Sequence, residues 1–126
     1  MLPIFKTDRI SKEWEELKTL NPRLRNILGQ LTDYVDHEFK KQVVITCIYR
    51  SPEENAELYK DSVEPAWRPH TLHCGADLRS SIYTPAEITK MLSFLNHFTV
   101  WKGQRKCAAF HAITGNVLHF HVQVDK

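Results

Sequence analysis

Apolar residues recur at helical spacing over two regions of the chain. The first region follows an Asn-Pro pair at positions 21–22, and its apolar residues are Leu24, Ile27, Leu28, Leu31 and Val35. Asparagine at the cap and proline in the first turn are preferred at a helix start, so this spacing predicts a helix with one apolar face. A shorter helix capped by Ser11 is predicted before it. Residues 11–40 are therefore interpreted as structural.

Two further helices are predicted by their N-terminal signals. Ser51-Pro52-Glu53-Glu54 and Thr84-Pro85-Ala86-Glu87 each place a Ser or Thr three residues before a Glu, with proline at the first helical position. In such a capping box the two side chains satisfy backbone N–H groups reciprocally. The second box precedes an apolar helix face made of Ile88, Met91, Leu92, Leu95 and Phe98. On this face Met91 is interpreted as core filling rather than as a ligand.

Other apolar runs are too short for helices and predict strands. Residues 43–49 are mostly β-branched and apolar, which predicts a strand buried on both faces. Residues 74–78 predict a short strand whose small side chains allow close backbone approach. Residues 106–113 and 117–124 flank Thr114-Gly115-Asn116 and predict a hairpin.

The order of these elements predicts the class of fold. Helices, strand, helix, strand, helix and hairpin favour an α+β domain with a small, mainly antiparallel sheet and helices packed on one side. The 126 residues suffice for a single domain, 1–126, with its own core, and a monomer is expected. The formal net charge is only +2, without a clustered basic stripe, so nucleic acid is not an expected partner. No apolar run reaches transmembrane length, so no membrane partner is expected either.

Cysteine usage and the first residues bear on the cellular compartment. Cys47, Cys74 and Cys107 are odd in number and form no Cys-x-x-Cys pair. They are interpreted as small buried hydrophobes in a reducing compartment. The start of the chain lacks the charged and apolar regions of a secretory signal. We therefore expect synthesis in the cytoplasm, and action outside the cell would need another exit route.

Histidines are the chemically informative residues of the chain. His70 precedes Asp77 by seven positions in a loop-like run, and His119, His121 and Gln123 share one face of the last predicted strand. Two imidazoles and one carboxylate from a loop and a distant strand would form a three-ligand site with one open position. Catalytic zinc is bound in this way.

A further histidine joins this site only under one condition. If residues 114–116 form the hairpin loop, Ile113 pairs with Val117 and His111 stands opposite His119, close enough to share the site. A two-residue loop would shift the register by one and remove that pairing.

Three segments together resemble a known family. Ile48-Tyr49-Arg50-Ser51-Pro52-Glu53-x-Asn55 resembles the substrate-arginine segment of the D-Ala-D-Ala carboxypeptidase-like zinc peptidases. These peptidoglycan-cleaving enzymes include phage L-alanyl-D-glutamate endolysins and are structurally related to the hedgehog signalling domain. His70-x6-Asp77-Leu78-Arg79 resembles their first two zinc ligands, and His119-Phe120-His121-Val122 resembles the strand that supplies the third. The matches follow the family's order over residues 43–124, about two-thirds of the chain.

The resemblance implies a hedgehog/DD-peptidase-like fold and a zinc peptidase. Zn²⁺ would be held by His70, Asp77 and His121, with Arg50 binding a substrate carboxylate or the oxyanion. The substrate would be a peptidoglycan stem peptide, cleaved at an amide bond by D,D-carboxypeptidase or L,D-endopeptidase chemistry. The implied enzyme is a lysin of the phage type, which acts on the cell wall after release or as part of a phage particle.

The chain departs from the family's pattern at three positions. Arg68 stands where serine is common, and His73 where glycine is frequent. Leu118 occupies the position at which many members carry a catalytic Glu or Asp, so proton transfer is assigned to His119 instead, with His111 assisting under its register condition. His73 is interpreted as a loop or supporting group, because a fourth protein ligand would close the site.

Other interpretations of the same residues stay open. His119 could bind the metal in place of His121, and Arg50 could form a structural ion pair at a helix start. A non-catalytic zinc-binding module, which recognises peptides or builds a virion, is the alternative function. A purely structural role for the histidines, without metal, is the third.

Overall fold

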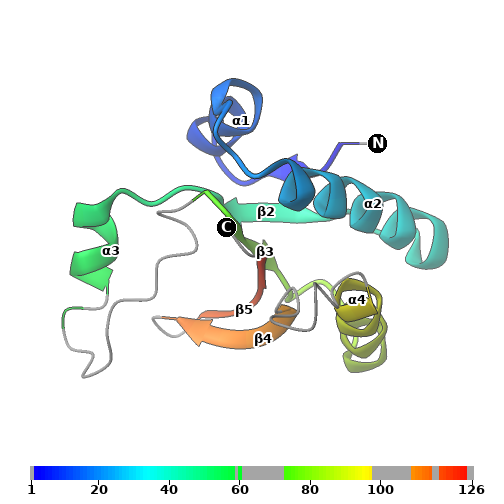
Figure 1. Cartoon of the computed structure of the whole chain (residues 1–126). Helices are drawn as coiled ribbons and strands as arrows, with labels where there is room; N and C mark the ends of the chain where they lie inside the picture. Colours follow the sequence, from blue (N-terminus) through cyan, green and yellow to red (C-terminus); the bar gives the residue numbers. More distant parts are fainter. Residues whose placement is uncertain (1, 59, 61–72, 98–108, 115–116, 125–126) are drawn as a thin grey trace.

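Five strands form one mixed sheet in the order β1-β2-β3-β5-β4 (Figure 1). The computed structural model describes residues 2–58, 60, 73–97, 109–114 and 117–124. The strands are β1 Ile4–Phe5, β2 Val44–Cys47, β3 Gly75–Arg79, β4 Ala109–Thr114 and β5 Val117–Gln123. β1 pairs with β2 in parallel, and the other neighbouring pairs are antiparallel. The predicted α+β class and mainly antiparallel sheet are confirmed, although β1 was not predicted.

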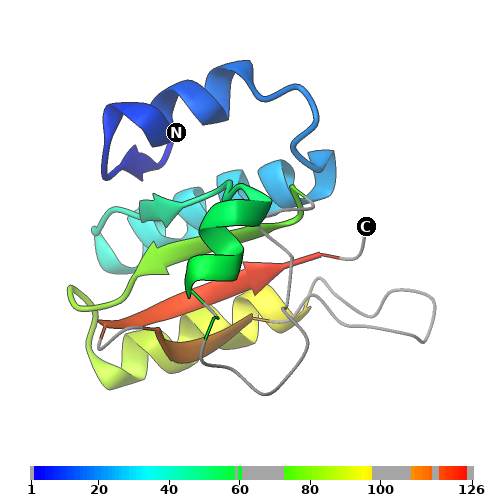
Figure 2. The same cartoon turned by 90° about the vertical axis from the view of Figure 1, so that its left-hand side faces the viewer.

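Helices lie on both sides of this sheet. They are α1 Asp8–Glu16, α2 Pro22–Phe39, α3 Pro52–Leu58 and α4 Pro85–His97. The two views show α2 and α4 covering one face, α3 at the opposite face and α1 beside the edge formed by β1 (Figures 1 and 2). The prediction that the helices pack on one side is therefore wrong for α3. Its sequence, PEENAEL, lacks the sustained apolar stripe that a helix buries against a sheet.

The two N-terminal helices begin at side-chain caps. The α1 cap is Thr7, whose Oγ1 accepts a hydrogen bond from the Ile10 backbone N–H at 3.3 Å. The prediction of Ser11 as this cap is wrong, because Thr7 already starts the helix one turn earlier. The α2 cap is Asn21, as predicted, and its Oδ1 accepts from the backbone N–H of Arg23 at 2.9 Å.

Both predicted capping boxes are confirmed. In the box of α3, the Glu54 N–H donates to Ser51 Oγ at 3.1 Å, and the Ser51 N–H donates to Glu54 Oε1 at 3.1 Å. In the box of α4, the Thr84 N–H donates to Glu87 Oε1 at 2.8 Å, and the Glu87 N–H donates to Thr84 Oγ1 at 3.2 Å. Each helix start is thus determined by four local residues.

The core lies between the sheet and the pair α2 and α4. It takes the predicted apolar face of α2, Met91 and Leu95 of α4, and alternate residues of β3 and β5. Met91 is fully buried, which confirms its interpretation as core filling. Tyr83 closes one end of the core, where its hydroxyl donates to the Gln42 backbone carbonyl. Burial there raises the pKa of Tyr83 to about 12.

Candidate functional site

Strands β3 and β5 carry apolar residues on one face and polar residues on the other. The antiparallel register pairs Asp77 with His121 and Arg79 with His119. Side chains alternate along each strand, so Leu78 and Phe120 enter the core while Asp77, His119 and His121 lie on the opposite face. The helix α3 lies on the side of the sheet away from α2 and α4 (Figure 2). Two segments more than 40 residues apart in sequence thus meet at one place.

Asp77 is the centre of this polar cluster. Its Oδ1 lies 3.0 Å from His121 Nδ1 and 3.5 Å from His119 Nε2. Its Oδ2 lies 3.7 Å from Arg50 Nη2. The side chain of Asp77 is 10% exposed, and those of His119 and His121 are 9% and 5% exposed. Charged groups are tolerated in the interior when they are paired in this way. The residues therefore form a buried, mutually paired cluster rather than a solvated strand face.

A β-bulge adds a cysteine to the same surroundings. Ile45 pairs with Leu78, but Cys47 pairs with Asp77, so Thr46 is an extra residue on β2. In a regular strand Cys47 would share the core face of Ile45. The bulge turns it toward the cluster, where its Sγ lies 3.8 Å from Arg50 Nη2. Cys47 is consequently only half-buried, whereas Cys74 is buried as predicted, and Cys107 lies outside the described residues.

Arg50 stands between β2 and α3, and a second arginine holds this connection. Arg9 of α1 hydrogen-bonds both carboxylate oxygens of Glu54, at 3.0 and 2.9 Å, and also contacts the Tyr49 carbonyl at 3.5 Å. The hydrogen bonds from Arg9 lower the pKa of Glu54 from 4.5 to about 2. In turn, the hydrogen bond to Glu54 raises the pKa of Arg9. The capping box and this bidentate pair together fix the backbone on both sides of Arg50.

His73 lies at the start of the described segment that leads into β3. Its φ of 61° is left-handed, a conformation that costs a non-glycine residue energy and needs surrounding contacts. Those contacts are a hydrogen bond between Nδ1 and Thr19 Oγ1 at 2.6 Å, one from the Asn21 N–H to the His73 carbonyl at 2.8 Å, and an edge-on ring contact with Tyr49. His73 thus ties the entry of β3 to the α1–α2 connection and to the residue before Arg50.

The hairpin register removes one predicted site residue. Thr114 pairs with Val117, so the loop has two residues and Ala112, not His111, stands opposite His119. His111 pairs with Phe120 instead. The three-residue loop on which the inclusion of His111 depended is not formed. Successive side chains of a strand point to opposite faces of the sheet. A register shift of one residue therefore removes His111 from the position opposite His119.

Some of the remaining predicted residues lie in the described part of the chain and some lie outside it. Asp77, His119, His121 and Arg50 come together as expected, whereas His70 and Arg68 lie outside the described residues. Sequence reasoning missed the position of Cys47, because no local signal announces the bulge.

The donor atoms can be tested against the geometry of zinc. Two donors bound to one tetrahedral Zn²⁺ at about 2.0–2.1 Å lie about 3.3–3.4 Å apart. The separations of 3.0 and 3.5 Å between Asp77 Oδ1 and the two histidine nitrogens bracket this value. Within the described residues, no three His, Cys, Asp or Glu side chains form a complete metal-binding group. Asp77 and His121, two of the three predicted ligands, are therefore neighbours with Nδ1 and Oδ1 3.0 Å apart, and His70 lies outside the described residues.

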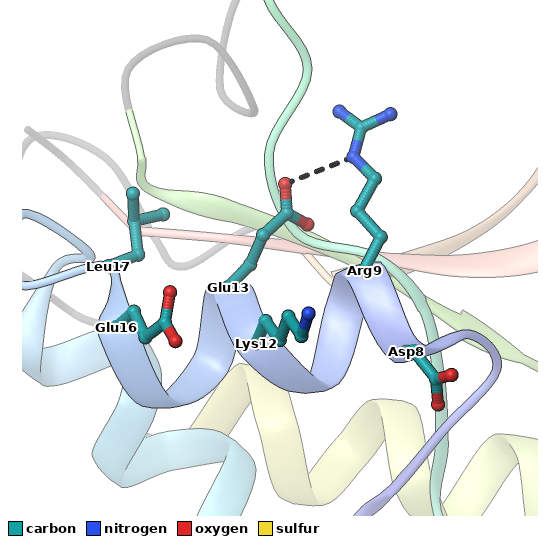
Figure 3. A pocket seen from close by; sticks show the side chains of 6 residues that line it. All are labelled: Asp8, Arg9, Lys12, Glu13, Glu16 and Leu17. Atoms are coloured by element: carbon teal, nitrogen blue, oxygen red, sulfur yellow. Dashed lines mark hydrogen bonds and ion pairs between the residues drawn. The ribbon is translucent and has the colours of Figure 1, made fainter.

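A separate depression runs along α1. Its described lining residues are Asp8, Arg9, Lys12, Glu13, Glu16 and Leu17 (Figure 3). Arg9 Nε bonds Glu13 Oε2 at 3.3 Å within it, so the charges of this depression are partly satisfied by one another. It has no histidine among these residues and is distinct from the Asp77 cluster.

Comparisons with known proteins identify no relative of this chain. No protein-family model matches the chain, and no curated protein or solved structure gives a significant match. None of the helices in the described part of the chain is both long and apolar enough to cross a membrane.

Proposed function

We propose that this protein is a zinc-dependent peptidase that hydrolyses amide bonds of peptidoglycan stem peptides. The observation that carries the proposal is the contact of Asp77 Oδ1 with His121 Nδ1 at 3.0 Å, with Arg50 at 3.7 Å from the other carboxylate oxygen. A carboxylate and an imidazole at ligand spacing, beside a cation and a second imidazole, match the parts that amide hydrolysis requires. The resemblance of the three sequence segments supplies the substrate class.

Asp77 and His121 would hold the ion together with His70. When bound, Zn²⁺ would lower the pKa of a water molecule toward neutrality and polarise the scissile carbonyl. The buried position of Asp77 and His121 limits competing water, which strengthens the electrostatic interactions inside the site. Their strands are paired residue by residue, so the two side chains are held by rigid elements rather than by a loop.

His119 is the candidate for proton transfer. It is buried beside the metal-ligand pair, with Nε2 at 3.5 Å from Asp77 Oδ1. In hydrolysis it would take a proton from the attacking water as the C–O bond forms, and give it to the leaving nitrogen as the C–N bond breaks. Leu118 cannot take this role because its side chain is apolar. In a regular strand it shares the face of Phe120, opposite to that of His119.

Arg50 would bind negative charge on the substrate. Its guanidinium lies at the edge of the cluster, and the Arg50 side chain is only 13% exposed, so a carboxylate or developing oxyanion there would meet a partly desolvated cation. A planar guanidinium can contact two oxygens at once. The Arg9–Glu54 pair and the α3 capping box keep its backbone in place.

Digestion of purified peptidoglycan tests this proposal. Zinc-loaded protein should release peptides with new ends, and mass spectrometry of the products separates the loss of terminal D-alanine from an internal cut. His121→Ala should lose both zinc and activity. His119→Ala should keep zinc but lower the rate by about 10²–10⁴-fold. His37→Ala, which removes an exposed histidine from α2, is the matched control and should change neither.

A second function is favoured by one departure from the family's pattern. Leu118 replaces an acid, which leaves a non-catalytic zinc-binding module for peptide recognition or virion assembly as the alternative. Stoichiometric zinc without any new peptide ends would support this module and contradict the peptidase. Absence of stoichiometric zinc in protein purified without chelator would contradict both.

A further inference from the structure

Gln123 contacts the imidazole of His121 on the side away from Asp77. It follows His121 by two residues on β5, so the two side chains share one face of the sheet. Its Oε1 lies 3.3 Å from His121 Nε2. Across the sheet Gln123 pairs with Gly75, which has no side chain to compete for this space. Gln123 is half-buried, as is suitable for a group that supports a buried residue.

Both ring nitrogens of His121 therefore face oxygen atoms. Nδ1 lies 3.0 Å from Asp77 Oδ1, and Nε2 lies 3.3 Å from Gln123 Oε1. A neutral imidazole has one N–H group, so it cannot donate to both oxygens. If Nε2–H donates to Gln123, the bare lone pair of Nδ1 points at a carboxylate oxygen. The Nδ1 lone pair of His121 and the carboxylate oxygen of Asp77 can face each other when both bind the same cation.

We propose that Gln123 is a positioning residue that selects the metal-binding tautomer of His121. Its carbonyl oxygen accepts the Nε2–H proton and holds the Nδ1 lone pair toward Asp77 and the shared ion. This inference rests on the proposed zinc site and adds to it the residue that prepares the ligand. It also designates His121, rather than His119, as the histidine on the metal. Ligating imidazoles generally donate their second N–H to such a partner.

An amide is chemically suited to this position. It carries both a donor and an acceptor, so without metal it can rotate and donate its NH₂ to Nε2 while Nδ1–H donates to Asp77. With metal, the carbonyl end accepts Nε2–H. The side chain is neutral and thus adds no negative charge beside Asp77. A carboxylate could accept Nε2–H but could not partner the other tautomer.

Zinc affinity of the full chain tests the inference. The variants are Gln123→Leu, which removes the hydrogen bond at similar size, and Gln123→Glu, which keeps the acceptor. Gln30→Leu, at an exposed position of α2, is the matched control. With a chromophoric chelator as competitor, Gln123→Leu should weaken zinc binding by about 10–100-fold, the usual cost of losing such a partner. Gln123→Glu should recover most of this loss, and Gln30→Leu should bind like the unmodified chain.

Nuclear magnetic resonance supplies a readout that a merely structural role would not change. In zinc-loaded protein labelled with ¹⁵N, His121 should carry its proton on Nε2 and show the metal-bound shift on Nδ1. The Nε2 proton should exchange with water faster in Gln123→Leu. If that variant does not fold, the tautomer in the unmodified chain still decides: metal on Nδ1 supports the inference, and metal on Nε2 overturns it.

The failures of the two proposals are distinguishable. If the unmodified chain binds zinc and Gln123→Leu binds it equally well, the role of Gln123 is overturned while the zinc peptidase stands. If the unmodified chain binds no zinc, both are overturned. If His119→Ala abolishes zinc binding while His121→Ala does not, the choice of His121 as the prepared ligand is overturned.

Discussion

At the centre of β3 and β5 the two faces are buried to nearly the same degree, but by opposite means. On one face Ala76, Leu78, Phe120 and Val122 are at most 1% exposed and pack against α2 and α4. On the other, Asp77, His119 and His121 are between 4% and 7% exposed as whole residues. The first face is stabilised by removing apolar area from water, which needs no particular partner. The second is tolerated only because each polar group finds a defined partner.

This difference indicates where stability and function reside. Apolar contacts are non-directional, so the core face can accept side chains of similar volume. The contacts around Asp77 are directional, and removal of one member takes a buried partner from the others. A protein has no need of such a cluster to close its sheet. The polar face is therefore the part of this fold to which we assign the proposed function.

Phe120→Ala should give the largest loss of stability, because it empties the centre of the core face. Phe120 is fully buried, with its ring 6.0 Å from that of Tyr83. The free energy of unfolding should fall by about 3–5 kcal/mol, measured by denaturant titration. Phe39→Ala, at a partly buried position, should cost less. Equal losses for the two variants would contradict the core assigned here.

Asp77→Asn should break the polar face. The substitution keeps the size of the side chain but removes the charge that faces Arg50 and the two histidines. The metal-free protein should lose about 1–3 kcal/mol of unfolding free energy, and zinc binding should be lost. Asp33→Asn, at an exposed position of α2, is the control and should cost less stability and leave zinc binding unchanged. A fully stable Asp77→Asn variant with normal zinc content would contradict the cluster.

Alkaline pH should weaken the core face through Tyr83. Burial raises its pKa from 10.0 to about 12, so the folded state favours the neutral phenol. This contribution is fully present below pH 10 and is lost as the pH rises through about 12. Tyr83→Phe should cost about 0.5–1.5 kcal/mol at neutral pH, because the hydrogen bond to Gln42 is lost. Thermal melting between pH 9 and pH 12 should then fall less steeply in the variant.

Acidic pH should weaken the Arg9–Glu54 pair that holds the backbone beside Arg50. Of the four changes, this one should have the smallest effect on stability. The folded pKa of Glu54 is about 2 against 4.5, so its contribution is present above pH 4.5 and is lost as the pH falls toward 2. The pair with Arg9 is exposed, and Glu54→Gln should therefore cost under about 1 kcal/mol at neutral pH. Its melting temperature should depend less on pH between 5 and 2 than that of the unmodified chain. Glu15→Gln, exposed on α1, should leave that dependence unchanged.

Much of the fold was predictable from short stretches of sequence. The apolar stripe after Asn21, the two capping boxes and the alternation of β5 each act over a few residues, and the structure confirms them. The prediction of Ser11 as the cap of α1 was wrong, because Thr7 and Ser11 can both cap a helix and the sequence does not rank them. The predicted side of α3 was also wrong, because a seven-residue polar helix carries no apolar stripe to direct it.

The candidate site depended on contacts that local patterns do not determine. Alternation alone placed His119 and His121 on one face. Their meeting with Asp77 and Arg50 required the pairing of β3 with β5 and of β2 with β3, which only the folded chain reveals. The sequence supplied these residues as candidates through spacing and resemblance.

What the sequence by itself determined is the set of elements and the face on which each strand residue lies, because caps and side-chain alternation are local properties. The tertiary structure decided the hairpin register that separates His111 from His119 and the bulge at Thr46 that turns Cys47 toward Arg50. These depend on a shift of one residue between neighbouring strands. A shift of that size changes no local propensity, but it exchanges the two faces of a strand.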